Sequence, residues 1–247
     1  MRLWPTYFVS ITLTMLILLF LQLPGRTCGV RDYLLNCLFL NGFIGTPYVD
    51  GAHWYITTLI SIIIINGVFN AFNISDKNFP YLIWMILAFL ATRVLKCSVI
   101  AQLLGGSYVG IACMGIAIRN FHKNAKTWKA ILIIALMYSC IMLGIKYANI
   151  LLFVTPIIIA TIKGKIKFLE SKILNKIGAI SYPLYLIHQN VGMAIEYNMM
   201  IMFKKYSLWY VIIAIFLVVI LAIVLYALVE KPSQKILNNC WSEIQTG

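Results

Sequence analysis

The sequence contains apolar runs that are each about as long as a lipid bilayer is thick. About 20 helical residues, each rising about 1.5 Å, cross a hydrocarbon core of about 30 Å. Runs that approach or reach this length lie at 4–23, 54–72, 80–95, 99–118, 128–145, 147–162, 177–202 and 208–228. They are continuous rather than alternating, which favours helices over strands. We therefore predict an all-α polytopic integral membrane protein with about eight transmembrane helices in a single membrane-embedded domain, 1–247.

The composition excludes the other common classes of chain. Hydrophobic residues make up 62% of the sequence and charged residues 11%, whereas soluble domains have about 45–50% and about 25%. Disordered chains need low hydrophobicity, so disorder is excluded as well. The net charge of +13 would suggest nucleic acid in a soluble protein. Here we assign it to loops beside a bilayer and expect no nucleic-acid partner.

The basic residues are distributed unevenly between the two sides of the predicted membrane topology. With the N-terminus inside, 13 of the 20 lysines and arginines fall in inner segments. The two strongest clusters, at 119–129 and 163–176, lie on the same side. The positive-inside rule then predicts a multi-pass protein of the plasma membrane with both termini in the cytoplasm.

The longest predicted outer segment, 24–53, contains an apolar stretch that is too short to span. This stretch, 33–44, is expected to lie on or re-enter the outer face. The same segment holds Cys28 and Cys37, which could form a disulfide in an oxidising compartment. The six cysteines show no CxxC spacing and no closely paired histidine, so no metal site is predicted.

The segment 177–202 carries polar or small residues on one helical face. They recur at steps of three and four, at Ser181, Tyr185, His188, Gln189, Gly192 and Glu196. Polar groups inside a membrane are costly and therefore mark candidate functional sites. His188, about 11 residues into the run, has two readings: it handles a proton or a substrate hydroxyl, or it is a neutral histidine that orients helices.

Two further segments carry weaker signals. His53 and Trp54 begin the helix predicted at 54–72, where aromatic residues usually anchor at the lipid headgroups. His53 is read either as a headgroup-level residue, with Asp50 as a possible partner, or as a residue that lines a site. Gly106 and Gly110 form a small-xxx-small step, which favours close helix packing over a cofactor loop.

Four segments together resemble the membrane-bound acyltransferase family 3. Residues 177–195 read IGAISYPLYLIHQNVGMAI, similar to a late family helix with Ser-Tyr, Tyr-Leu and His. Glu230-Lys231-Pro232 resembles the family's closing Glu-Lys-Pro, and 51–56 resembles its Trp-led helix entrance. The opening Arg2-Leu3-Trp4-Pro5 resembles the end of an arginine-rich loop before the third helix.

The resemblance implies a fold of ten membrane helices. It also implies an enzyme that attaches acetyl or other acyl groups to hydroxyls of cell-surface glycans, with cytoplasmic acyl-CoA as co-substrate and no bound cofactor. Eight helices would correspond to the last eight of the ten. The family's usual catalytic histidine is on its first helix, and no position here matches it. We therefore expect either a truncated or inactive copy or a sequence whose start lies too far downstream.

The predicted function is an integral membrane O-acyltransferase that transfers an acyl group, preferably acetyl, to a glycan or lipid-linked saccharide. His188 is the predicted catalytic base. The predicted substrate-binding residues are Tyr185, Gln189, Ser181, His53 and Trp54, and the predicted acyl-CoA-binding residues are Arg2, Arg119 and Lys123. Two alternatives remain: a polytopic transporter, and a non-catalytic membrane partner in polysaccharide export.

Overall fold

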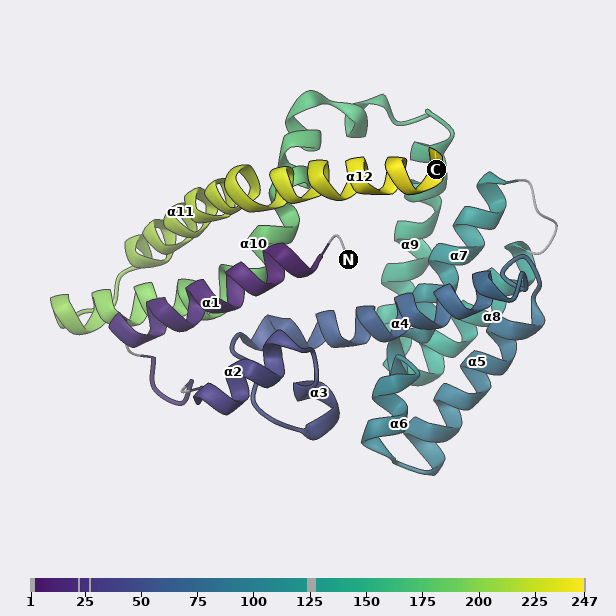
Figure 1. Ribbon diagram of the computed structural model, residues 1–247, viewed down its shortest axis with the longest axis horizontal. Helices are drawn as coiled ribbons and strands as arrows, with labels where there is room; N and C mark the ends of the chain where they lie inside the picture. The colour runs from purple at the N-terminus through teal and green to yellow at the C-terminus, as the bar shows by residue number, and fades with distance from the viewer. Residues whose placement is uncertain (1–2, 22, 27, 124–127, 247) are drawn as a thin grey trace. The chain divides into compact units, whose positions relative to one another are not determined.

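The computed structural model describes residues 3–21, 23–26, 28–123 and 128–246. The chain is 83% helical, and the described part contains no strand. The elements in order are α1 (Trp4–Phe20), α2 (Val30–Cys37), α3 (Asn41–Ile44), η1 (Gly51–His53), α4 (Trp54–Ala71), α5 (Phe79–Phe89), η2 (Leu90–Val94), α6 (Ser98–Leu103), η3 (Gly106–Tyr108), α7 (Val109–His122), α8 (Trp128–Leu143), α9 (Ile145–Ile162), η4 (Lys167–Glu170), α10 (Lys172–Phe203), α11 (Leu208–Leu225), η5 (Tyr226–Glu230) and α12 (Lys231–Thr246) (Figure 1).

Several of these helices have the length and composition of membrane spans. Within the described residues, four helical stretches are long and apolar enough to cross a membrane: Gly51–Ala71, Ser98–His122, Ile145–Ile162 and Leu208–Asn239. Shorter apolar helices cover Trp4–Phe20, Phe79–Val94 and Trp128–Leu143. The predicted all-helical, apolar architecture is therefore confirmed. The long helix α10 is absent from both groups, because polar residues interrupt its apolar sequence.

The chain forms two compact units. The first comprises Met1–Asn41, Gly45–Trp54 and Ser171–Gly247, and the second comprises Gly42–Ile44 and Tyr55–Glu170. In the first unit, α1 and α11 both pack against α10. Side-chain caps fix the starts of two of these helices, since Ser171 accepts a hydrogen bond from Leu174 N–H and Ser207 accepts one from Trp209 N–H.

One asparagine fastens the connection between α2 and η1 in the first unit. The Asn36 amide donates to the carbonyl oxygens of Asp32 and Pro47 at 2.8 and 3.0 Å, and its Oδ1 accepts from Val49 N–H at 3.3 Å. The side chain is fully buried. The predicted outer segment therefore contains the short helices α2, α3 and η1, with a loop that Asn36 holds to α2. Cys28 and Cys37 in this segment are free thiols.

The second unit is built around the packing of α7 on α8. Its core contains buried residues from α5, α7 and α8, including Trp84, Cys113 and Ala135. Gly110 allows the close approach, because a Cβ there would lie 2.9 Å from Ala135 O and would collide with Ser139 Oγ. The structure therefore agrees with close helix packing at Gly110.

Several predicted boundaries differ from the structure. The segment predicted as one helix at 99–118 contains a turn at Leu104–Gly105, where Gly105 has a φ of +82°. The Trp84 indole N–H donates to Leu104 O at 2.7 Å, which satisfies the carbonyl that the turn releases. The run predicted at 80–95 ends in a π-helical turn, η2. The helix predicted at 177–202 is longer, and the one predicted at 4–23 is shorter.

Candidate functional site

The polar face predicted on 177–202 forms one wall of a groove in the first unit. The groove has a volume of about 630 Å³ and lies between α10 and α11. All six residues of the predicted face line it: Ser181, Tyr185, His188, Gln189, Gly192 and Glu196. The opposite wall is formed by α11 residues, which are Val211, Ala214, Ile215, Val218 and Val219.

The His188 imidazole is exposed and has a defined hydrogen bond. Its Nδ1 lies 2.9 Å from the backbone oxygen of Tyr185. A carbonyl oxygen only accepts, so this contact requires the proton on Nδ1, and in the neutral imidazole Nε2 then carries the lone pair. Nε2 makes no hydrogen bond to the described residues. The arrangement therefore suits a neutral histidine that accepts a proton.

Of the other residues on this face, Tyr185 and Ser181 have their hydroxyl protons committed to backbone oxygens. Tyr185 Oη donates to Ala52 O at 2.6 Å, and Ser181 Oγ donates to Gly178 O at 2.7 Å. Gln189 packs against Gly51, where a Cβ would come within 2.8 Å of the amide group. Tyr185 and Gln189 thus connect the groove to η1, while Gln189 keeps an amide in the groove lining.

Asp50 and His53 hold η1 against α10. The Asp50 carboxylate accepts Ala52 N–H through Oδ1 and Asn190 N–H through Oδ2, both at 2.9 Å. His53 Nε2 donates to Leu186 O at 2.9 Å. In an α-helix, the carbonyl of residue 186 and the N–H of residue 190 are partners of each other. The His53 and Asp50 side chains therefore bond to the two ends of one turn of α10. His188 and Gln189 belong to this turn.

His53 is packed inside the first unit. Its ring is fully buried, and the Tyr7 ring packs edge-on against it at a centroid distance of 5.0 Å. His53 is not among the residues that line the groove. Its contact with the helix that carries His188 is the hydrogen bond to the backbone oxygen of Leu186. Trp54, the other predicted substrate-binding residue at this helix start, is 39% exposed and also lies outside the groove lining.

The sequence segments behind the family resemblance meet in the first unit. Tyr182 Oη donates to Leu3 O at 2.9 Å, which connects the Ser-Tyr pair of α10 to the start of α1. Tyr182, Leu3 and Glu230 line a second cavity of about 370 Å³. Glu230 is buried and accepts a hydrogen bond from the Gln234 amide at 2.7 Å. Since η1, α1 and η5 all contact α10, the other three segments lie at the helix that contains 177–195.

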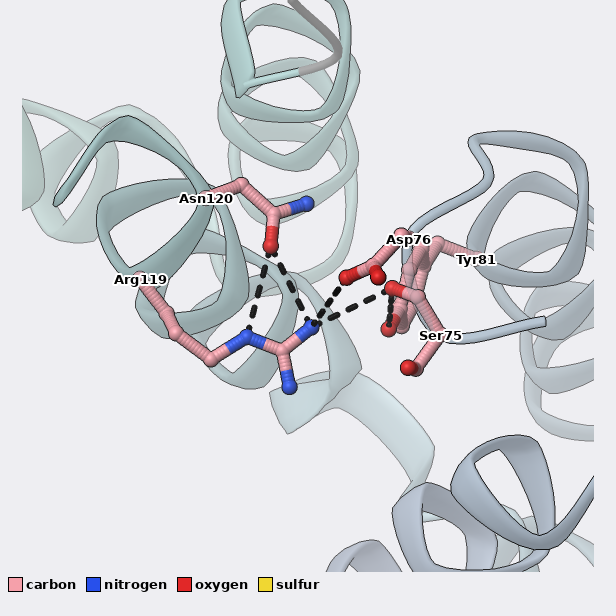
Figure 2. A network of polar contacts seen from close by, with 5 residues as sticks. All are labelled: Ser75, Asp76, Tyr81, Arg119 and Asn120. Atoms are coloured by element: carbon pink, nitrogen blue, oxygen red, sulfur yellow. Dashed lines mark hydrogen bonds and ion pairs between the residues drawn. The ribbon is translucent and has the colours of Figure 1, made fainter. Parts of the chain in front are cut away.

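Arg119 and Lys123, two of the three residues predicted to bind acyl-CoA, are not among the residues that line the groove. Arg2 lies outside the described residues, whereas Arg119 and Lys123 belong to the second unit. Figure 2 shows the Arg119 guanidinium directed at the loop between α4 and α5, where Nη2 lies 3.2 Å from Ser75 O and 3.9 Å from Asp76. Tyr81 Oη donates to the same Ser75 oxygen. Arg119 therefore fastens α7 to this loop.

The structural roles of Asn190 and Asn36 were not predicted from the sequence. Asn190 is fully buried, and its amide donates to Val49 O at 2.8 Å. The available signal was its position on the otherwise apolar face of 177–202, opposite the polar stripe. Asn36 offered no comparable signal, because its partners in the 47–49 loop depend on the tertiary fold.

Comparisons of the chain with protein-family models, curated proteins and solved structures found no match. Within the described residues, no three histidine, cysteine, aspartate or glutamate side chains are grouped to hold a metal ion. The chemistry available in the groove is therefore that of His188, Gln189 and Glu196 beside an aliphatic wall.

Proposed function

We propose that the protein is an integral membrane O-acyltransferase that transfers an acyl group, preferably acetyl, from acyl-CoA to a hydroxyl of a cell-surface or exported glycan. The observation that carries the proposal is the hydrogen bond from His188 Nδ1–H to Tyr185 O, because in the neutral imidazole of this groove-lining residue it leaves the lone pair on Nε2. The resemblance to the membrane-bound acyltransferase family 3 adds support, since its segments converge on the same helix.

The proposed reaction uses His188 as a general base. Nε2 takes the proton from the acceptor hydroxyl, and the oxygen attacks the thioester carbonyl. The tetrahedral intermediate collapses, the acyl–oxygen ester forms, and CoA leaves as its thiol after regaining the proton from His188. Gln189 supplies an amide N–H that can donate to the oxyanion. Tyr185 is a positioning residue in this scheme, because its carbonyl fixes the tautomer of His188.

The proposal includes a membrane topology. Eight spans are proposed, with 177–202 among them despite its polar residues, because its polar face lines a groove rather than requiring contact with lipid. Both termini are placed in the cytoplasm at the plasma membrane. Acyl-CoA would then approach the basic inner face, where Arg2, Arg119 and Lys123 contribute positive charge that attracts a polyanion.

The experiment measures acyl transfer in membrane vesicles that contain the protein. Vesicles are supplied with radiolabelled acetyl-CoA and a membrane extract as acceptor, and base-labile label in the glycan and glycolipid fractions is counted. We expect His188→Ala to lower the rate about 10²–10⁴-fold. The matched control is His122→Ala, because His122 is exposed at the end of α7 and lies outside the groove lining.

The result also separates the proposal from the alternative functions. A transporter or a non-catalytic membrane partner would leave no ester-linked label in either fraction. Equal label with the wild type and the His188→Ala variant, at equal protein levels, would remove His188 from the reaction.

A further inference from the structure

The two walls of the α10–α11 groove differ in chemistry. The α10 wall offers the imidazole of His188, the amide of Gln189 and the carboxyl group of Glu196 beside the apolar side chains of Leu184 and Met193. The five lining residues of α11 are all aliphatic. A polar saccharide filling the groove would turn hydroxyls toward the aliphatic wall, where they would find no hydrogen-bond partner. Each such hydroxyl costs on the order of 1–3 kcal/mol. The groove is therefore matched to a ligand with one polar and one apolar part.

The groove also has the dimensions of a site for such a ligand. Its polar residues extend from Ser181 to Glu196, which corresponds to about 22 Å along a helix. Its volume of about 630 Å³ lies in the range of small-molecule sites. α11 belongs to Leu208–Asn239, the most apolar of the four candidate spans found among the described residues. A hydrocarbon chain could therefore lie along α11 and remain within the apolar layer.

The charge of the groove narrows the choice of headgroup. Glu196 is its acidic lining residue, and its lining contains no lysine or arginine. A phosphate headgroup would meet an acidic neighbour and no cationic partner. Sugar hydroxyls, in contrast, can donate to Glu196 and His188 Nε2 and accept from the Gln189 amide.

We propose that the α10–α11 groove binds a neutral glycolipid, with sugar hydroxyls at His188 and Gln189 and a hydrocarbon chain along α11. The inference rests on the proposed function in one respect, namely that the bound glycolipid is the acyl acceptor. The binding itself requires no acyl transfer. The acceptor hydroxyl is then held beside His188 by a chain anchored in the membrane.

The test uses photolabelling of the full chain in phosphatidylcholine nanodiscs. The probe is an alkyl β-glucoside that carries a diazirine in its alkyl chain, and the labelled peptides are identified by mass spectrometry. We expect label in the peptide that contains 211–219, and we expect dodecyl maltoside at tenfold excess to reduce it at least fivefold. Phosphatidylglycerol at the same excess should leave it unchanged.

Matched substitutions separate the groove from the rest of the helix surface. Val219→Trp and Val211→Trp fill the groove, and each should reduce labelling at least fivefold. Ile220→Trp and Ile212→Trp are adjacent controls outside the lining, both at exposed positions, and should leave labelling unchanged. A second probe, a phosphatidylcholine with the same diazirine chain, measures the preference for the sugar headgroup. Gln189→Leu should still be labelled, but it should be labelled equally by the glucoside and by this phosphatidylcholine.

Equal labelling by the glucoside and the phosphatidylcholine probe in the wild type would overturn the inference, because the groove would then hold only bulk lipid. Unchanged labelling in both groove-filling variants would also overturn it. If labelling fails while acyl transfer to a soluble oligosaccharide is observed, the inference falls and the proposed function stands. If labelling succeeds and no transfer occurs, the inference stands and the proposed function falls.

Discussion

At the residue scale, the geometry around α10 depends on a few side chains whose polar atoms are matched to backbone groups. Asp50, His53 and Tyr185 all bond to main-chain atoms that lie more than 130 residues away in the sequence. The six residues of the predicted polar face line one groove because their spacing follows helix geometry alone. The contact between Asp50 and α10 could not be predicted, since the Asn190 N–H that Asp50 accepts is distant in the sequence.

Asp50→Asn is expected to destabilise the protein although the two side chains are nearly equal in size. Each carboxylate oxygen accepts a different backbone N–H, whereas an amide has one oxygen and would direct its NH₂ group at a donor. We expect a loss of about 1–3 kcal/mol, seen as a lower midpoint of thermal unfolding in detergent. Asp76→Asn is the control, because the Asp76 side chain is 71% exposed, and its midpoint should stay near that of the wild type. Equal midpoints for all three proteins would contradict the assignment of Asp50.

The Cys28 thiol is expected to react slowly at neutral pH. Partial burial, with a smaller contribution from the charge of Asp32, raises the pKa of Cys28 from about 9 to about 11. The thiolate is the reactive form, so at pH 8 its fraction is about 100-fold lower than for a thiol with an ordinary pKa. Peptide mass spectrometry after iodoacetamide treatment should show alkylation of Cys28 that increases up to about pH 11.

Asp32→Asn provides the check on this prediction. Removing the acidic neighbour takes away one of the two contributions that raise the pKa, so alkylation at pH 8 should become faster. An alkylation rate for Cys28 that stops increasing near pH 9 in the wild type would contradict the raised pKa of this thiol.

At the element scale, apolar length predicts where helices lie but not where they stop. The run predicted at 54–72 corresponds closely to α4, and the one at 147–162 to α9. The turn at Leu104–Gly105 was not predicted, because it depends on the Trp84 indole from another helix and on the positive φ of Gly105. The length of α10 was underestimated, since its first turn is polar and starts at the Ser171 cap. A tertiary partner therefore accounts for the unpredicted turn, and a local cap accounts for the added length of α10.

The contact between α7 and α8 provides a prediction at this scale. Gly110→Ala should destabilise the second unit, because the added Cβ would meet Ala135 O and the Ser139 and Tyr138 side chains. We expect a loss of about 1–3 kcal/mol, measured as a lower thermal midpoint. Gly115→Ala in the same helix is the matched control. It has no heavy atom within 4 Å of the added Cβ, so the better helix propensity of alanine should stabilise the protein by up to about 1 kcal/mol. Equal shifts at the two glycines would contradict the packing described here.

At the scale of the whole molecule, the sequence predicted apolar helices with the length of membrane spans but not the division of the chain into two compact units. Composition and the length of the apolar runs were enough to predict the apolar helices, because neither depends on which residues are in contact. The division depends on which helices pack together, and no linker in the sequence marks it. The prediction of a single membrane domain with eight spans stays a prediction.

The proposed topology can be checked with reporter fusions. Truncation of the chain after Gly164, within the basic cluster 163–176, should place a fused alkaline phosphatase in the cytoplasm, where it is inactive. Truncation after Lys205 should place it outside, where it is active. These expectations follow from the 13 inner basic residues and the positive-inside rule. The opposite pattern of activity would reverse the proposed orientation and remove the basic clusters from the side where acyl-CoA enters.

The central claim, acyl transfer with His188 as the base, is tested most directly with purified protein in proteoliposomes. The liposomes contain an alkyl glucoside as acceptor, acetyl-CoA is added outside, and the released CoA thiol and the acetylated glucoside are measured together. The account predicts one acetylated glucoside per CoA released, dependence of both products on the acceptor, and loss of both in His188→Gln. Transfer by His188→Gln at the wild-type rate, or CoA release without acetylated product, would contradict it.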